Sequence, residues 1–131
     1  MEDSERYKKG LEIRQEVLGK DYVNQALAKT DEFTGPFQEF ITRYAWGEIW
    51  GRGGLTRRER SLITLAMLVA LNRETEFRLH VRGAFRNGVT VEELRELLLH
   101  SGIYCGVPAA NAAIRAAEDV ISETKGGPGS S

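Results

Sequence analysis

The sequence predicts an all-α protein, a bundle of six or seven helices. Apolar residues recur at helical spacing along almost all of the 131 residues, and no segment shows the apolar–polar alternation of a half-buried strand. Two segments, "TRRE" at 56–59 and "TVEE" at 90–93, have the residues of a capping box, which starts a helix. We predict a single domain over residues 1–124 and a flexible tail over residues 125–131.

The first half of the chain predicts three helices. Residues 5–18 form a weakly amphipathic helix that ends at Gly19, and a short helix follows over residues 21–30. Residues 33–50 form the third helix, with Phe37, Phe40, Ile41 and Tyr44 on its core face. The glycine-rich "GRGG" at 51–54 predicts a loop.

The second half predicts the centre of the bundle. "LITLAMLVAL" at 62–71 is apolar nearly all round, which predicts a central, buried helix. Gly88 is placed to end the next helix. Residues 91–104 should then turn Val91, Leu94, Leu98 and Tyr104 towards the core, and residues 105–121 form a last helix with a proline in its first turn.

Composition excludes several classes of partner and site. The net charge of -1 and pI near 6.2 give no basic field for nucleic acid, and the longest apolar stretch is about half of a membrane span. The single cysteine, Cys105, permits no internal disulfide and suggests a cytoplasmic protein. With two histidines and one cysteine, the sequence shows no metal signature, so we expect no bound metal.

The segment "LNRETEFRLH" at 71–80 is the first candidate site. On a helix, Glu76 and His80 lie at i and i+4, and Arg73 lies one turn earlier, at the margin of the face formed by Phe77 and Val81. An acid–base pair beside a guanidinium suits a small anionic substrate. The alternative is a surface ion pair contributing about 0.2–0.5 kcal/mol.

The helix over residues 33–50 carries further candidates. On an α-helical wheel Glu48 falls in the middle of the apolar stripe, where a carboxylate needs a partner or a raised pKa, and either suits a general acid or base. Alternatively, Gly47 or the helix end turns Glu48 to solvent. Arg43, Trp46 and Trp50 gather on the opposite face, which suggests a subunit interface first and an anion pocket second.

Arginines near the start of a helix are candidates for binding a substrate carboxylate. Arg57, Arg58 and Arg60 lie in the first turn predicted after Thr56, where backbone N–H groups also favour anions. The basic run at 52–60 is short and lacks interleaved aromatic residues, so we do not interpret it as a nucleic-acid site.

Nearly the whole chain resembles the carboxymuconolactone decarboxylase family. The most specific elements are "RYAWGEIW" at 43–50, "LNRETE" at 71–76, His80 and "YCGVPAAN" at 104–111. The resemblance implies an all-α fold of the alkylhydroperoxidase D type and a ring-like homohexamer built from trimers. It also implies a lactone dicarboxylate substrate and cofactor-free decarboxylation of 4-carboxymuconolactone to the β-ketoadipate enol-lactone plus CO₂, in protocatechuate breakdown.

The resemblance also assigns roles to the candidate residues. His80, Glu76 and Glu48 are the expected catalytic groups, and Arg73, Arg43, Arg60 and Trp46 are expected to bind substrate. The alkylhydroperoxidase relatives carry a CxxC motif whose second cysteine lies four residues before a histidine.

If His80 is that histidine, Arg73 and Glu76 occupy the two cysteine positions. A thiol-dependent peroxidase or peroxiredoxin-like antioxidant is therefore only an alternative, as is a non-catalytic oligomeric helical protein.

Overall fold

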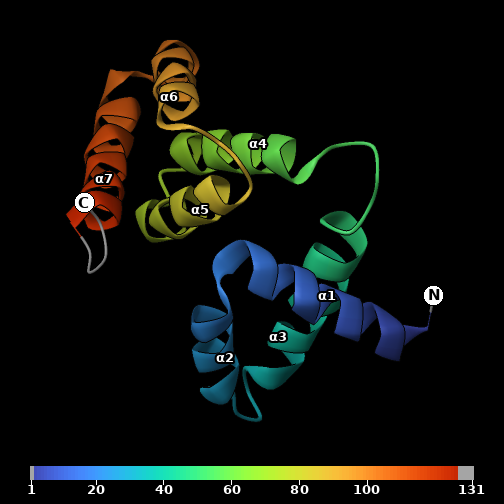
Figure 1. Cartoon of the computed structure of the whole chain (residues 1–131). Helices are drawn as coiled ribbons and strands as arrows, with labels where there is room; N and C mark the ends of the chain where they lie inside the picture. The colour runs from blue at the N-terminus through green and yellow to red at the C-terminus, as the bar shows by residue number, and fades with distance from the viewer. Residues whose placement is uncertain (1, 127–131) are drawn as a thin grey trace. The chain divides into compact units, whose positions relative to one another are not determined.

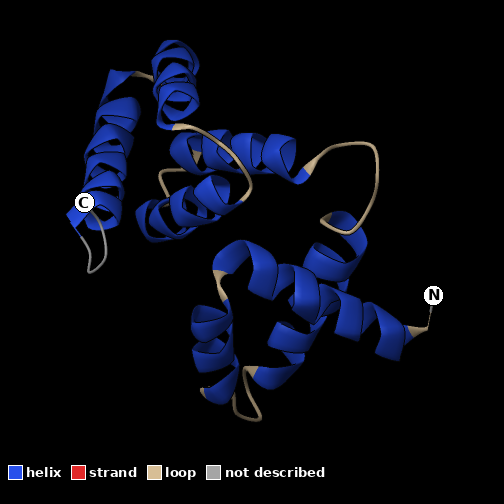
Figure 2. Cartoon of the chain, in the orientation of Figure 1, coloured by secondary structure: helices blue, strands red, loops and turns tan. Residues whose placement is uncertain are grey.

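The computed structural model describes residues 2–126, with side chains placed for residues 2–124, and within them every element of regular secondary structure is a helix (Figure 2). The helices are α1 (Asp3–Leu18), α2 (Lys20–Ala28), α3 (Gly35–Ile41), the π-helix η1 (Thr42–Ile49), α4 (Arg57–Ala70), α5 (Glu74–Arg86), α6 (Val91–Cys105) and α7 (Val107–Gly126) (Figure 1). The all-α prediction is confirmed for this range, and residues 127–131 of the predicted tail lie outside it. Over the same range, no helix combines the length and apolar character needed to cross a membrane.

The chain divides into two compact units that meet in sequence between Arg57 and Arg58. The first unit contains α1, α2, α3 and η1, and the second contains nearly all of α4 together with α5, α6 and α7. The expectation of one domain over residues 1–124 stays a prediction, and each unit is described by itself.

In the first unit, α1 packs backbone to backbone against η1. A Cβ atom on Gly10 would collide with the carbonyl oxygen of Thr42, and one on Gly47 would lie 2.6 Å from the carbonyl oxygen of Arg6. Only glycine permits so close an approach of two helices. Thr42, Trp46 and Gly47 are consequently buried on η1.

The predicted helix over residues 33–50 differs from the structure in its register and in its buried face. It divides into α3 and the π-helix η1, whose hydrogen bonds close one residue later than those of an α-helix. The predicted core residues Phe37 and Tyr44 are exposed, whereas Trp46, predicted to be exposed unless covered by another subunit, is buried. The prediction was wrong because α1 docks on the glycine-containing face.

The second unit is built around one apolar cluster. Phe77, Val81 and Ala84 are buried along one side of α5, as the helical wheel predicts. The capping box of α6 is confirmed, because Glu93 N donates to Thr90 Oγ1 at 3.1 Å and Thr90 N donates to Glu93 Oε1 at 3.0 Å. The same cluster contains Leu65, Val69, Val89, Leu94, Leu98, Ala113, Ala116, Ala117 and Val120.

Two predictions of burial in this unit were wrong. Helix α4 buries Leu65 and Val69, but Met67 is 59% exposed on the opposite side, so α4 is not buried all round. On α6, Leu94 and Leu98 are buried while Val91 and Tyr104 are exposed. A four-helix unit of this size covers only one stripe of each helix.

Candidate functional site

The predicted site on "LNRETEFRLH" begins at the tight turn between α4 and α5. Asn72 adopts a left-handed conformation with φ 57°, which is unusual for a residue other than glycine. Arg73 follows as the N-cap, and α5 starts at Glu74. Arg73 is therefore outside the helical register that the wheel assumed, and the turn decides where its side chain points.

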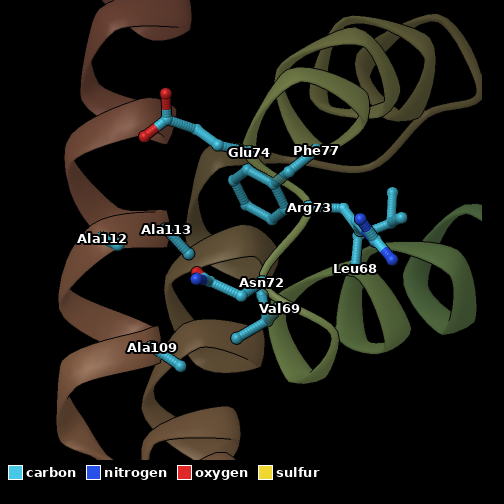
Figure 3. Close-up of a pocket in the computed structure, with 9 residues that line it drawn as sticks. All are labelled: Leu68, Val69, Asn72, Arg73, Glu74, Phe77, Ala109, Ala112 and Ala113. Carbon is cyan, nitrogen blue, oxygen red and sulfur yellow. The ribbon is translucent and has the colours of Figure 1, made fainter.

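A small pocket lies at this turn, bounded by the end of α4, the start of α5 and helix α7 (Figure 3). The Asn72 amide points towards α7, while the guanidinium of Arg73 extends away from α7. The pocket holds about 10 Å³, roughly the room of one water molecule. A lactone does not fit inside it, so its contribution is to fix the turn that presents Arg73. The lining residues are Leu68, Val69, Asn72, Arg73, Glu74, Phe77, Ala109, Ala112 and Ala113.

Glu76 and His80 both lie on α5, and the structure places His80 at the edge of the buried face as predicted. Glu76 is exposed and His80 is partly buried. Burial lowers the pKa of His80 from 6.5 to about 4, and the negative charge of Glu76 opposes this shift only in part. At neutral pH the His80 imidazole is therefore uncharged, and it can donate a hydrogen bond from one ring nitrogen.

Arg73 has the exposed guanidinium expected of a carboxylate-binding group. Among the described residues of its own unit, no carboxylate pairs with it. Two neighbouring arginines of α5 differ, because Arg78 pairs with Asp119 and Arg82 pairs with Glu123. Arg73 thus remains available for an anion, while the other two stabilise the contact of α5 with α7.

Glu48, on η1 in the first unit, forms an ion pair that the sequence did not reveal. Its Oε2 accepts a hydrogen bond from Arg6 Nε at 3.2 Å, and the guanidinium of Arg6 also lies over the Tyr44 ring. The Glu48 side chain is 45% exposed, so it does not lie in an apolar stripe. Of the two sequence interpretations, the structure supports partial exposure together with a charged partner.

Arg43 and Trp46 occupy different environments on η1. The guanidinium of Arg43 lies 5.4 Å from the centre of the Tyr7 ring and within 4.0 Å of Glu39. Trp46 is 6% exposed and stacks on Trp50 with ring centres 5.0 Å apart. Arg43 retains access to solvent, whereas Trp46 contributes chiefly to packing.

The three arginines of the first turn of α4 are not equivalent. Arg57 pairs with Glu16 at 3.1 Å, and Arg58 pairs with Glu93. Arg60 is partly buried in the same turn. The two ion pairs hold the side chains of Arg57 and Arg58 against other helices.

The structure therefore places Arg73 at the N-cap of α5, and Glu76 and His80 one turn apart along that helix, where the charge of Glu76 acts on the His80 ring. Glu48 is placed on η1 of the other unit. Sequence reasoning missed Arg6 as the partner of Glu48, since nothing in a helical wheel relates residues 42 positions apart. The left-handed conformation of residue 72 could have been predicted from the sequence, because asparagine is enriched in that conformation.

Comparison with known proteins places these residues in a family. Residues 35–119 match the carboxymuconolactone decarboxylase family. The chain is 54% identical over 123 residues to 4-carboxymuconolactone decarboxylase of Acinetobacter baylyi, covering 94% of this chain and 92% of that protein. It is 43% identical over 117 residues to nitrosuccinic acid decarboxylase of Metarhizium robertsii, covering 89% of this chain and 82% of that protein. The matched segment includes every candidate site residue, and the chain belongs to the carboxymuconolactone decarboxylase family.

Proposed function

We propose that this chain is a carboxy-lyase that converts 4-carboxymuconolactone to the β-ketoadipate enol-lactone and CO₂ without a cofactor. The observation that carries the proposal is the start of α5, where an exposed arginine precedes a glutamate and an uncharged histidine by three and seven residues. This segment lies inside the region that matches the family, and the relative with 54% identity is named for this reaction.

The substrate itself can accept the electrons that decarboxylation releases. Its γ-carbon carries the departing carboxylate and an acetate arm, and breaking the C–CO₂ bond sends the electron pair through the ring double bond to the lactone carbonyl. The resulting dienolate takes a proton at the α-carbon and becomes the enol-lactone. Nitrosuccinic acid, for which the second relative is named, also has two carboxyl groups and an electron-accepting nitro group. Both cases require the protein to bind carboxylates and stabilise a developing oxyanion.

The uncharged imidazole of His80 suits the oxyanion better than the proton delivery. A neutral imidazole is a hydrogen-bond donor of low acidity, and it stabilises charge on the lactone oxygen without a prior protonation step. Glu76, one turn before it, orients the ring and biases which nitrogen carries the proton.

The candidates that deliver a proton to the α-carbon are then Glu48, and His80 after the electron shift. Arg73, Arg43 and Arg60 are the candidate partners of the substrate carboxylates, because a guanidinium fork matches a carboxylate with two hydrogen bonds. Trp46 lines the substrate region through packing, since it is buried against Trp50.

The direct test is turnover of the γ-carboxylated lactone by the purified full chain. We expect one CO₂ to be released for each enol-lactone formed, without added metal or cofactor. The enol-lactone is detected by its ultraviolet absorbance. The matched control is the lactone lacking the γ-carboxylate, which should not react. A folded protein that leaves the carboxylated lactone intact would show that the proposal is wrong.

Replacing Cys105 by serine should leave decarboxylation at the wild-type rate. Cys105 is the only cysteine of the chain, it ends α6 and it is partly buried, and the proposed mechanism makes no use of a thiol. The measurement is kcat with the lactone beside a peroxide-reduction assay of the same two proteins. Peroxide reduction that disappears in Cys105→Ser, with no decarboxylation in either protein, would favour the thiol-peroxidase alternative.

The assembly and cellular setting are part of the same proposal. We propose a cytoplasmic homohexamer built from trimers, acting in protocatechuate catabolism through the β-ketoadipate pathway. Ile63 and Met67 support an oligomer, because they lie four residues apart on an exposed side of α4, and the exposed Leu71 directly follows that helix. Sedimentation equilibrium of the full chain tests the assembly, and a monomer mass at working concentration would contradict it.

A further inference from the structure

Arg14 is a buried cation that the proposed reaction does not use. It lies on α1 with only 5% of its surface exposed. Its Nη1 donates to Thr42 Oγ1 at 3.2 Å and its Nη2 donates to Gln38 Oε1 at 3.0 Å, while Nε is buried and has no hydrogen-bond partner among the described residues. Both partners are uncharged.

No carboxylate of the described residues compensates the charge of Arg14. Arg14 occurs in none of their ion pairs, and burial lowers its pKa from the ordinary value, with no carboxylate among the groups that oppose the shift. Burying an ion without a counter-ion is unfavourable, and an apolar side chain of similar volume is often the more stable choice. Stability alone therefore does not explain an arginine at this position.

The two groups that Arg14 contacts mark the point where α3 becomes η1. Thr42 is the first residue of the π-helix, and Gln38 lies one turn earlier. Because Arg14 occupies Thr42 Oγ1 as an acceptor, the Thr42 hydroxyl proton is directed to the Gln38 carbonyl, where the hydrogen bond measures 2.7 Å. A hydroxyl bonded to the carbonyl four residues earlier competes with the α-helical N–H and bends the helix.

The contact of η1 with α1 decides which group Glu48 meets. Its carboxylate accepts a hydrogen bond from Arg6 Nε at 3.2 Å, and the same guanidinium lies over the ring of Tyr44, one turn earlier on η1. Arg6 and Arg14 belong to one helix, α1, so Arg14 binds the first residue of η1 while Arg6 binds a residue near its end. π-Helical turns such as η1 are frequent at functional sites.

We propose that Arg14 is a positioning residue: its hydrogen bonds to Gln38 and Thr42 hold the start of η1 against α1, so that the Glu48 carboxylate lies beside Arg6. The inference rests on the proposed role of Glu48 in decarboxylation for its catalytic consequence. Its structural consequence, the docking of η1 on α1, is independent of that role.

The experiment combines kinetics with the structure of one variant, all in the full chain. Arg14→Met removes the donors but keeps the volume, Arg14→Lys keeps the charge, and Thr42→Val removes the hydroxyl that Arg14 contacts. Arg95→Met is the matched control, because Arg95 is an exposed arginine of α6 outside the site. Each variant is compared with Glu48→Gln and with the double variant Arg14→Met/Glu48→Gln.

We expect Arg14→Met to unfold at or above the wild-type temperature and to lose about 10-fold to 10²-fold in kcat with KM little changed. Thr42→Val should lose a similar factor, Arg14→Lys less, and Arg95→Met nothing. The double variant should be no slower than Glu48→Gln, because two residues that act through one group are not additive. A crystal structure of Arg14→Met should show Glu48 withdrawn from Arg6.

Several results would overturn the inference. These are wild-type kcat in Arg14→Met, kcat losses that multiply in the double variant, a fully active Glu48→Gln, or an unchanged η1 with Glu48 still on Arg6 in Arg14→Met. If Arg14→Met does not fold, Arg14→Lys and Thr42→Val provide the same comparison. If the wild-type chain does not decarboxylate the lactone, the proposed function fails, and the crystal structure alone then decides the role of Arg14.

Discussion

Replacing His80 by alanine should lower kcat for decarboxylation by about 10²-fold to 10³-fold, the usual effect of removing one donor to an oxyanion. His80 lies at the edge of the buried face of α5, one turn after Glu76. The packing of Phe77 and Val81 does not require the imidazole, so the variant should remain folded. The measurement is kcat and KM with the lactone, with the circular-dichroism melting temperature as a check of folding.

His100→Ala is the matched control, since His100 is the only other histidine of the chain. It is exposed on α6 and stacks on Tyr104 with ring centres 5.1 Å apart. Its removal should leave kcat unchanged. Near-wild-type kcat in a folded His80→Ala protein would remove His80 from the mechanism.

The pH dependence of the wild-type enzyme provides a second test of the proposed role of His80. Because burial lowers its pKa to about 4, the imidazole stays neutral as the pH falls through 6.5. We therefore expect no inflection in kcat/KM from the ordinary histidine pKa, and a loss of activity only as the pH approaches 4. An inflection near pH 6.5 that disappears in His80→Gln would instead indicate that His80 titrates normally and acts as a charged acid.

The same pKa shift predicts the direction of the acid dependence of stability. Below pH 6.5 the unfolded chain takes up a proton on His80, whereas the folded chain does so only near pH 4. Protons therefore favour the unfolded state in that window, and the free energy of unfolding should decrease as the pH is lowered from 6.5 to 4. In His80→Gln the decrease over this window should be smaller.

Helix α5 could be predicted from the sequence because its burial is decided locally. Phe77, Val81 and Ala84 recur at helical spacing, and the structure buries them together. His80 falls at the margin of that face on any α-helical wheel, and it does so in the structure. The capping box at Thr90 was equally predictable, because both of its hydrogen bonds join residues three positions apart.

Helix η1 could not be predicted, since its register depends on contacts distant in sequence. Thr42 accepts a hydrogen bond from Arg14, 28 residues earlier, and Glu48 accepts one from Arg6, 42 residues earlier. The α-helical wheel put Phe37 and Trp46 on opposite faces, as the structure does, but it could not tell which of the two faces α1 would cover. The close approach of α1 through Gly10 and Gly47 then buried Trp46 in place of Phe37.

The apolar surface of α4 illustrates a different limit of sequence reasoning. Apolar residues on all sides of residues 62–71 predict burial of the whole helix, but they do not say by what. Within this chain only the side of Leu65 and Val69 is buried, and Met67 on the other side is exposed. The apolar residues thus predict that the surface of α4 is covered. They do not predict which other surface covers it.

Replacing Arg73 by methionine should raise KM about 10²-fold, since truncating one partner of a charged, hydrogen-bonded pair commonly has an effect of this size. Arg73 is exposed at the N-cap of α5 and has no carboxylate partner among the described residues of its unit, so little stability is lost with it. Arg73→Lys should recover part of the affinity, because lysine keeps the charge but not the two-point geometry. Arg115→Met, which removes an exposed arginine of α7, is the control and should match the wild type.

The division of the Arg73 effect between KM and kcat identifies the carboxylate that Arg73 binds. The acetate arm is charged in both the substrate and the transition state, so losing its partner raises KM and leaves kcat unchanged. The departing carboxylate loses its charge as CO₂ forms, so a partner there stabilises the ground state more than the transition state. Removing such a partner would raise KM and also raise kcat. We expect the first pattern, because an arginine paired tightly with the departing group would oppose the reaction; an unchanged KM would remove Arg73 from substrate binding altogether.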